Sequence, residues 1–327
     1  MNNQKNMDNS LTAPKYQRVL VKLSGEALMG DAAFGISTKV LDYLAGEIQT
    51  LVDLKVQTSL VIGAGNIFRG VSGASAGMDR AAADNMGMLA TVINALALQD
   101  ALERKGIPAR VLSAIPMLTV CEPYSRHKAL HHLKKGRVVI FGAGTANPYF
   151  TTDTAAVLRG LEINADLVCK ATRVDGVYDK DPLKHKEAVK FSRLNFSEVL
   201  HRRLKVMDSA AISLAMDNNT SIMVFDMNIP GNMKRAICGE QIGTLIQGED
   251  NERNSRCPDR KNDGQHRGLQ ARSHQGPDRP GYHRPARRGK GNGLRLAAAA
   301  QPSRRRDHPG KQNAGYPALG RQAPSRH

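Results

Sequence analysis

The chain has 327 residues and a formal net charge of +17, from 47 Lys and Arg residues against 30 Asp and Glu residues. This length allows one large or two medium domains, and the absence of Trp predicts a mostly aliphatic core. The polar first ten residues argue against a secretory signal, and the lack of an 18-residue apolar run argues against a membrane span. The four cysteines are widely spaced, which argues against a zinc knuckle or a disulfide framework and favours a reducing cytoplasm.

The first predicted strand is 17–23, after a leader at 1–15 that we expect to be disordered. It ends in a turn of small residues, Ser24-Gly25. Lys22 stands near its carboxyl end, where open α/β sheets place their ligands. The alternatives for this lysine are a solvated side chain and a phosphate contact. The glycine turns that follow other strands favour the phosphate contact.

A helix is predicted at 37–54, capped by its first residue, Ser37, and a strand at 58–62. A second glycine-rich turn follows at 63–70. It does not complete a GxGxxG motif, because position 68 is Phe, so a nicotinamide-type fold is disfavoured. Arg69 suits a phosphate fork, with a surface charge as the alternative.

The next elements are a long apolar helix, a strand and a basic helix, expected at 81–102, 109–113 and 124–135. Asp84, in the first turns of the long helix, is either a helix-dipole partner or a group that grips a sugar hydroxyl. His127 and His131 have the spacing of a zinc pair, but no third ligand is in view, so a solvated helix face is favoured.

The stretch 141–153 organises the chain. It follows a buried strand at 137–141 and leads into a helix at 154–159, with Gly142 and Gly144 in the turn. A helix N-terminus after such a turn offers unpaired N–H groups and a positive dipole end, which together bind phosphate. Hydroxyl and amide side chains add partners, and an acidic group beside them suggests a metal or another cation.

Further strands are predicted at 166–172, 221–225 and 243–246, and further helices at 196–204, at 206–215 with Asp208 at its start, and after Pro230. Alternating strands and helices with glycine turns at strand ends predict a three-layer αβα sandwich with a mostly parallel central sheet. No GxxxxGK[ST] motif is present, so a P-loop enzyme is excluded. The domain is expected to span 16–247.

The positive charge is concentrated in 248–327, which holds 18 of the Lys and Arg residues, 7 of the Asp and Glu residues, and no Val, Ile, Phe, Met or Trp. Such a segment cannot bury enough apolar surface to offset its ordering entropy, so we expect a disordered, basic, low-complexity tail. It is either a nucleic-acid-binding extension or an out-of-frame extension. The lack of regular stacking aromatics favours the second.

Five motifs occur in order and resemble the bacterial uridylate (UMP) kinases of the amino-acid kinase superfamily: 22–27, 61–70, 84–91, 144–153 and 170–178. The resemblance covers about residues 16–246. It implies the amino-acid kinase fold and reversible transfer of a phosphoryl group from ATP to UMP, giving ADP and UDP in pyrimidine nucleotide biosynthesis. It further implies Mg²⁺ carried by ATP, a cytoplasmic homohexamer, GTP as activator and UTP as inhibitor, and no membrane or nucleic-acid partner.

Site residues follow from the same resemblance, position by position. The catalytic residues would be Lys22, Asp153 and Asp208. ATP would be bound by Lys22, Leu23, Ser24, Gly25, Gly65, Arg69, Thr172, Tyr178 and Asp181. UMP would be bound by Ala64, Asp84, Thr145, Ala146, Asn147, Pro148, Tyr149, Phe150, Thr151 and Thr152, and GTP by Gly30, Asp31, Ala32, Ala33, Phe34 and Gly35. Ala64 departs from the family, which usually has glycine there, and Gln99, Glu103 and Arg126 differ at effector positions.

Two other functions stay open. A different member of the superfamily would phosphorylate a carboxylate or carbamate, against which the loop 147–153 argues. A nucleic-acid-binding protein would use the basic tail.

Overall fold

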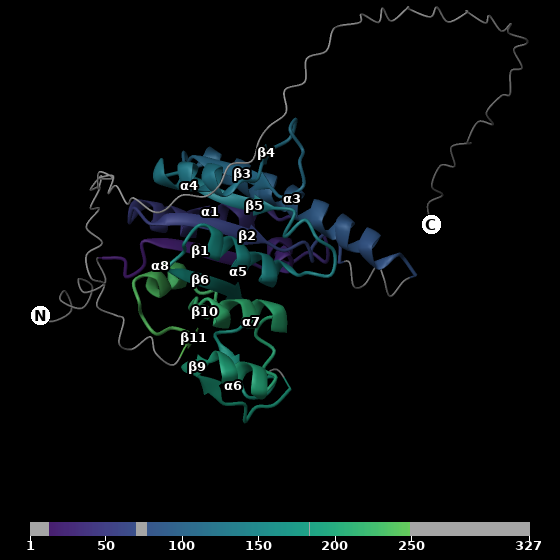
Figure 1. Ribbon diagram of the computed structural model, residues 1–327. Helices are drawn as coiled ribbons and strands as arrows, with labels where there is room; N and C mark the ends of the chain where they lie inside the picture. The colour runs from purple at the N-terminus through teal and green to yellow at the C-terminus, as the bar shows by residue number, and fades with distance from the viewer. Residues whose placement is uncertain (1–12, 70–76, 183, 249–327) are drawn as a thin grey trace, which may run out of the picture. The chain divides into compact units, whose positions relative to one another are not determined.

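The computed structural model describes residues 13–69, 77–182 and 184–248, so the predictions for the first twelve residues and for the tail beyond 248 lie outside it. In the described part, nine strands form one sheet in the order β4-β3-β5-β2-β1-β6-β10-β11-β9 (Figure 1). Their bounds are β1 Arg18–Leu23, β2 Gln57–Ile62, β3 Ala109–Ser113, β4 Glu122–Pro123, β5 Val138–Gly142, β6 Leu167–Thr172, β9 Arg193–Asn195, β10 Ile222–Asp226 and β11 Thr244–Gln247.

The sheet is mostly parallel. Every pair from β4 to β10 runs parallel, and the direction reverses only between β10 and β11. A separate two-stranded antiparallel ribbon joins β7 (Val177–Tyr178) to β8 (Lys190–Phe191). The predicted α/β sandwich with a mostly parallel sheet is thereby confirmed.

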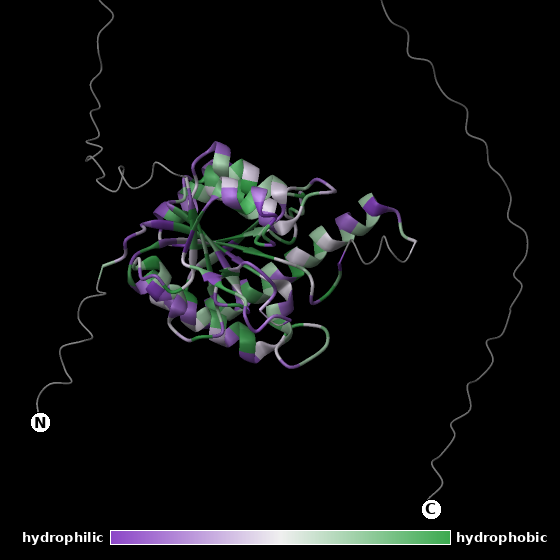
Figure 2. Ribbon diagram, turned by 90° about the horizontal axis from the view of Figure 1, so that it is seen from below, coloured by the Kyte–Doolittle hydropathy of each residue, from purple (hydrophilic) through white to green (hydrophobic). Residues whose placement is uncertain are grey.

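Helices cover both faces of the sheet. Their bounds are η1 Gly25–Met29, α1 Thr38–Asp53, α3 Arg80–Arg104, α4 Arg126–Lys134, α5 Thr152–Glu162, α6 Phe196–His201, α7 Ser209–Asp217 and α8 Asn232–Ile237. One core lies between the sheet and α1, α3 and α8, and a second lies between the sheet and α4 to α7. In Figure 2 the strands are mainly green, whereas purple is concentrated on the helices and loops.

The strands alternate between these two cores, as the two-residue period of a strand requires. In β1, Val19, Val21 and Leu23 face the first core, whereas Leu20 faces the second. Lys22 follows Leu20 by two residues and therefore shares the α5 side of the sheet. Both faces are buried, which explains why the strands read as near-continuous apolar runs.

Helix α3 is longer than predicted, and part of it extends past the edge of the sheet (Figure 1). By length and composition it could cross a membrane, but its buried side chains, including Ala95, Leu98 and Leu102, pack in the first core. Three apolar residues of this helix, Met86, Leu89 and Ile93, are 43%, 44% and 51% exposed. The helix is apolar around much of its circumference, so one face stays uncovered in a single chain.

Some boundaries differ from the prediction for local reasons. The helix predicted from Tyr124 begins two residues later, because Ser125 is its N-cap and accepts the N–H of Lys128. The helix predicted to end at 204 ends at His201, and Arg203 has a left-handed φ of 52°. Ser37 does precede α1 but makes no side-chain capping hydrogen bond.

Candidate functional site

The turns after β1 and β2 touch. These strands are parallel neighbours, so their carboxyl ends meet at the same edge of the sheet. The Gly63 N–H donates to the Leu23 carbonyl at 2.9 Å. A Cβ atom on Gly25 would lie 2.5 Å from the Gly63 carbonyl oxygen, so only glycine permits this approach.

The third turn, after β5, reaches the same edge because β5 pairs with β2. Ala143, Gly144, Ala146 and Tyr149 all have positive φ, between 55° and 71°. Left-handed backbone at non-glycine residues costs of order 1 kcal/mol or more each and is concentrated at functional sites. The loop 143–149 is therefore held in an unusual conformation beside the other two turns.

Three charged side chains meet where these turns converge. Lys22 and Lys170 lie opposite each other on β1 and β6. The Asp153 carboxylate, in the first turn of α5, lies against both, with Oδ1 2.8 Å from Lys22 Nζ and Oδ2 2.7 Å from Lys170 Nζ. Oδ1 accepts no well-aligned hydrogen bond from the described residues, so its contact with Lys22 is an ion pair.

The charges in this cluster are mostly buried, and burial opposes each of them. Burial by itself would raise the pKa of Asp153, but Lys22 and Lys170 together outweigh it and lower that pKa. Burial lowers the pKa of Lys170, and Asp153 opposes that effect only in part. The cluster has one more positive than negative charge, which suits an anion at the sheet edge.

Asp208 links the N-termini of α5 and α7 and does not face Lys22. It is the N-cap of α7 and accepts the Ala211 N–H at 2.9 Å. Its carboxylate also accepts the hydroxyls of Thr154, at 2.9 and 3.0 Å, and of Thr151, the N-cap of α5. Its charge also acts on Lys170 and opposes, in small part, the lowering of the pKa of that lysine by burial.

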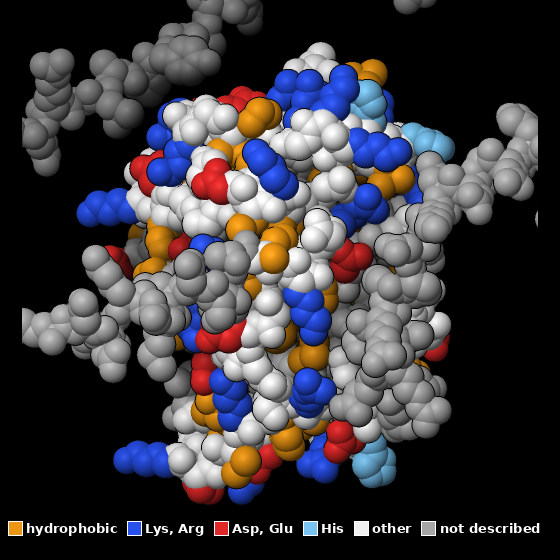
Figure 3. Space-filling view, turned by 90° about the vertical axis from the view of Figure 1, so that its left-hand side faces the viewer, with side chains coloured by type: hydrophobic (Ala, Val, Ile, Leu, Met, Phe, Trp, Pro, Cys, Tyr) orange, Lys and Arg blue, Asp and Glu red, His pale blue; other side chains and the backbone are white. Residues whose placement is uncertain are grey.

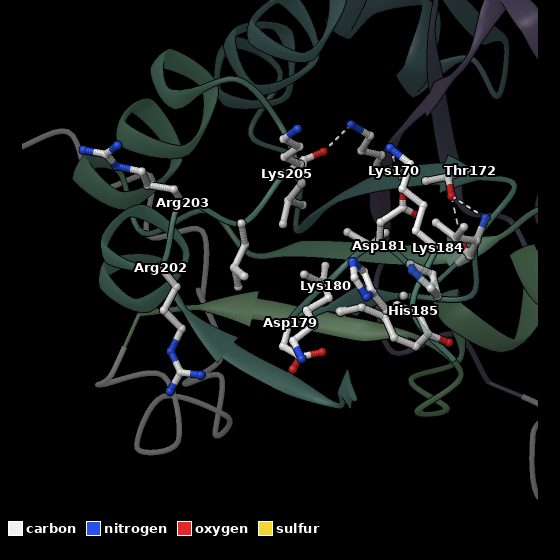
Figure 4. A pocket seen from close by; sticks show the side chains of 18 residues that line it. Lys170, Thr172, Asp179, Lys180, Asp181, Lys184, His185, Arg202, Arg203 and Lys205 are labelled. Atoms are coloured by element: carbon white, nitrogen blue, oxygen red, sulfur yellow. Dashed lines mark hydrogen bonds and ion pairs between the residues drawn. The ribbon is translucent and has the colours of Figure 1, made fainter. Parts of the chain in front are cut away.

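A cavity of about 640 Å³ opens beside the charged cluster, within the size range of small-molecule sites. Lys170 belongs to its lining and so connects it to Asp153. Three of the predicted ATP residues, Thr172, Tyr178 and Asp181, also line it. Figure 4 shows Lys170 and Lys205 along the upper rim, Arg202 and Arg203 at the left, and Asp181, Lys184 and His185 at the right.

The other predicted residues occupy three places. Arg69 pairs with the Glu26 carboxylate, next to Gly65. Asp84 accepts the Tyr149 N–H and the Arg80 Nε–H, each at 2.8 Å, and so holds the loop 143–149. The loop 30–35 lies beside the second turn, since the Gly35 N–H donates to the Asn66 carbonyl at 3.0 Å. Phe34, Tyr149 and Phe150 are exposed.

Sequence reasoning missed several residues of this site. Lys170 stood in a predicted strand, but its position opposite Lys22 depends on strand pairing. The basic lining of the cavity could have been recognised from the short runs of cations at 180–185 and 202–205. Asn94, which forms a buried hydrogen-bonded pair with Asn66 of the second turn, gave no sequence signal.

The carboxylates of this site already have protein partners, so a metal ion bound here would take most of its ligands from the substrate. Asp153 is engaged by two lysines, and Asp208 by two hydroxyls and an N–H group. Within the described ranges, no three His, Cys, Asp or Glu side chains gather as a metal site. Mg²⁺ commonly binds through substrate phosphates with few protein ligands, which fits this arrangement.

Charged side chains are unevenly distributed on the side of the molecule drawn in Figure 3. Lys, Arg and His side chains lie close together at the top of that view, and over the rest of it cations alternate with Asp and Glu.

Residues 17–226 match the family model described as 'Amino acid kinase family'. Among solved structures, the UMP kinase of Bacillus anthracis is 44% identical, covers 72% of this chain and 97% of that chain, and has a TM-score of 0.70. The UMP kinase of Ureaplasma parvum is 36% identical, with coverages of 71% and 98% and a TM-score of 0.67. The uridylate kinase of Archaeoglobus fulgidus is 29% identical, with coverages of 70% and 99% and a TM-score of 0.56.

Proposed function

The chain belongs to the amino acid kinase family. Because it is 44% and 36% identical to two UMP kinases of known structure, we propose that it transfers the terminal phosphoryl group of ATP to UMP. The observation that supports this most directly is the Lys22–Asp153–Lys170 cluster, which lies between the converging turns and the 640 Å³ cavity. A phosphoryl group in transit between two nucleotides would lie next to fixed positive charges there.

The chemistry needs positioning and charge neutralisation more than covalent help. A phosphate oxygen of UMP forms the new P–O bond, and the bond between the terminal phosphorus of ATP and its bridging oxygen breaks, which releases ADP. The attacking oxygen is already anionic, so no general base is required. Lys22 stabilises the negative charge on the moving group, and Asp153 holds Lys22 in place.

We assign ATP to the cavity and to the turn after β1, with Thr172, Tyr178 and Asp181 around the base and ribose. UMP then lies along the loop 143–149 and the N-terminus of α5, within reach of Asp84. Ala64 keeps the backbone N–H that a phosphate would use. When bound, Mg²⁺ on the ATP phosphates supplies further charge neutralisation.

Assembly and regulation extend this proposal. The exposed Met86, Leu89 and Ile93 on α3 would be covered by another copy of the chain, which supports self-association, and the homohexamer is the assembly that the resemblance to UMP kinases implies. GTP would act at the loop 30–35, which contacts the second turn through Asn66, and UTP would compete for the UMP site. The chain would work in the cytoplasm.

A coupled assay of ADP release tests the substrate. The purified chain is given ATP and, in separate reactions, UMP, CMP, aspartate, glutamate or carbamate. We expect turnover with UMP well above that with the other acceptors. Turnover with a carboxylate or carbamate instead would assign the chain to a different activity within the same family, and no turnover with UMP above background would reject the proposal.

A further inference from the structure

Two buried asparagines pair where the turn after β2 meets α3: Asn66 belongs to the turn and Asn94 to the helix. Asn66 and Asn94 are 1% and 0% exposed. Buried amides are costly unless their hydrogen bonds are satisfied, so a pair of them in a core calls for a specific role.

The pair satisfies itself and two backbone carbonyls. Each side chain donates to the other, Asn66 Nδ2 to Asn94 Oδ1 at 2.9 Å and Asn94 Nδ2 to Asn66 Oδ1 at 2.7 Å. The remaining hydrogen atoms go to backbone, from Asn94 to the Gly63 carbonyl at 2.7 Å and from Asn66 to the Gly35 carbonyl at 3.0 Å. Since carbonyls only accept, these contacts fix the orientation of both amides.

The Gly63 carbonyl is also the atom that Gly25 approaches most closely, because a Cβ on Gly25 would lie 2.5 Å from it and 2.7 Å from Asn66 Oδ1. A shift of this carbonyl would therefore move the turn after β1 as well as its own. The asparagine pair lies at the point where these two turns are in contact.

Helix α3 holds the third turn in the same way. Thr91, three residues before Asn94, accepts the Ala143 N–H at 2.8 Å, and Asp84 accepts the Tyr149 N–H. One rigid helix thus fixes backbone atoms of the turn after β2, which touches the turn assigned to ATP, and of the loop 143–149 assigned to UMP. Their separation is set by the spacing of three side chains along α3.

We propose that Asn94, together with Asn66, is a positioning residue that sets the distance between the two nucleotide-binding turns and so determines the rate of phosphoryl transfer. The inference rests on the proposed function for its kinetic test. A displacement of about 1 Å between reacting groups can reduce a rate on the order of 100-fold, so small changes in this pair become measurable.

The test compares Asn94→Ala and Asn66→Ala with Leu98→Ala, a buried apolar truncation one turn further along α3. We expect both asparagine variants to lose about 10- to 100-fold in kcat with little change in KM for either nucleotide. Leu98→Ala should lower the melting temperature comparably but keep kcat within about twofold. The double asparagine variant should lose no more than either single variant, since each one breaks the same pair.

Amide hydrogen exchange gives a readout that does not depend on activity. Without nucleotide, residues 63–69 should exchange faster in Asn94→Ala than in Leu98→Ala. Equal exchange in the two variants, equal loss of kcat, or additive losses in the double variant would each overturn the inference. If the wild type does not phosphorylate UMP, the proposed function fails while the exchange comparison still decides the positioning role. Should Asn94→Ala not fold, Asn66→Ala and the isosteric Asn94→Asp serve in its place.

Discussion

Replacing Asp153 by asparagine removes the one negative charge that lies against two largely buried lysines and keeps the side-chain shape. At an effective dielectric constant of about 20, each contact at 2.7–2.8 Å is worth about 6 kcal/mol before the burial of the charges is subtracted. Removal of one partner from a buried pair typically costs about 3–5 kcal/mol, and we expect Asp153→Asn to lower the free energy of unfolding by that amount at pH 7.

The effect has a definite pH dependence. The pKa of Asp153 is lowered from 3.8, because Lys22 and Lys170 outweigh burial, so its stabilising contribution is present above that pH and lost as the pH falls through the lowered value. The variant lacks this contribution throughout. Burial already lowers the pKa of Lys170, and loss of Asp153 lowers it further. The variant therefore regains stability as the pH rises toward the ordinary lysine pKa of 10.5, because Lys170 loses its proton in the folded chain before it does in the unfolded chain.

Urea unfolding followed by circular dichroism at pH 5, 7 and 9.5 measures both effects. The matched control is Asp100→Asn, which breaks the exposed pair with Arg104 and should cost less than about 1 kcal/mol. We expect the gap between wild type and Asp153→Asn to be large at pH 5 and 7 and smaller at pH 9.5. A gap under about 1 kcal/mol at pH 7, or one that does not change with pH, would refute the reasoning about this cluster.

Three further outcomes are expected. Lys22→Ala should lower turnover by about 10²- to 10³-fold while calorimetry finds UMP affinity unchanged, and an unchanged rate would remove Lys22 from its proposed role. Gly25→Ala should lose about 1–3 kcal/mol of stability and most of its turnover, because the new Cβ atom collides with the Gly63 carbonyl. The control Gly46→Ala, in open space on α1, should gain about 0.5–1 kcal/mol of stability. Similar melting temperatures for the two variants would contradict this prediction. A chain cut after Gly248 should keep its melting temperature and turnover, and tight RNA binding at physiological salt that the cut abolishes would instead assign the tail a function.

Much of the fold could be predicted because its signals are local. The apolar runs at 17–23, 58–62 and 137–141 are buried on both faces, and each ends in small residues, so strand and turn were both visible. In a parallel sheet such turns share one edge, and the structure places them there. The ribbon of β7 and β8 was missed, since two-residue strands have no detectable period.

The site was harder to predict because its contacts join distant parts of the chain. Lys170 lies opposite Lys22 only through the register of β1 with β6, which no local pattern specifies. The start of a helix at Asp208 was predicted, but not its bonds to Thr151 and Thr154 on another helix. The exposed face of α3 could not be predicted either. The sequence does not show whether an apolar residue packs against its own chain or against another one.

The central place of β1 has a consequence for synthesis of the chain. Among the described strands it is the first to leave the ribosome, yet its two sheet neighbours are β2 and the much later β6. At about 5–20 residues per second, Lys22 waits on the order of 10 s for the strand that completes its surroundings. During that time one edge of this apolar strand has no pairing partner. The nascent chain is therefore most exposed to aggregation in this interval.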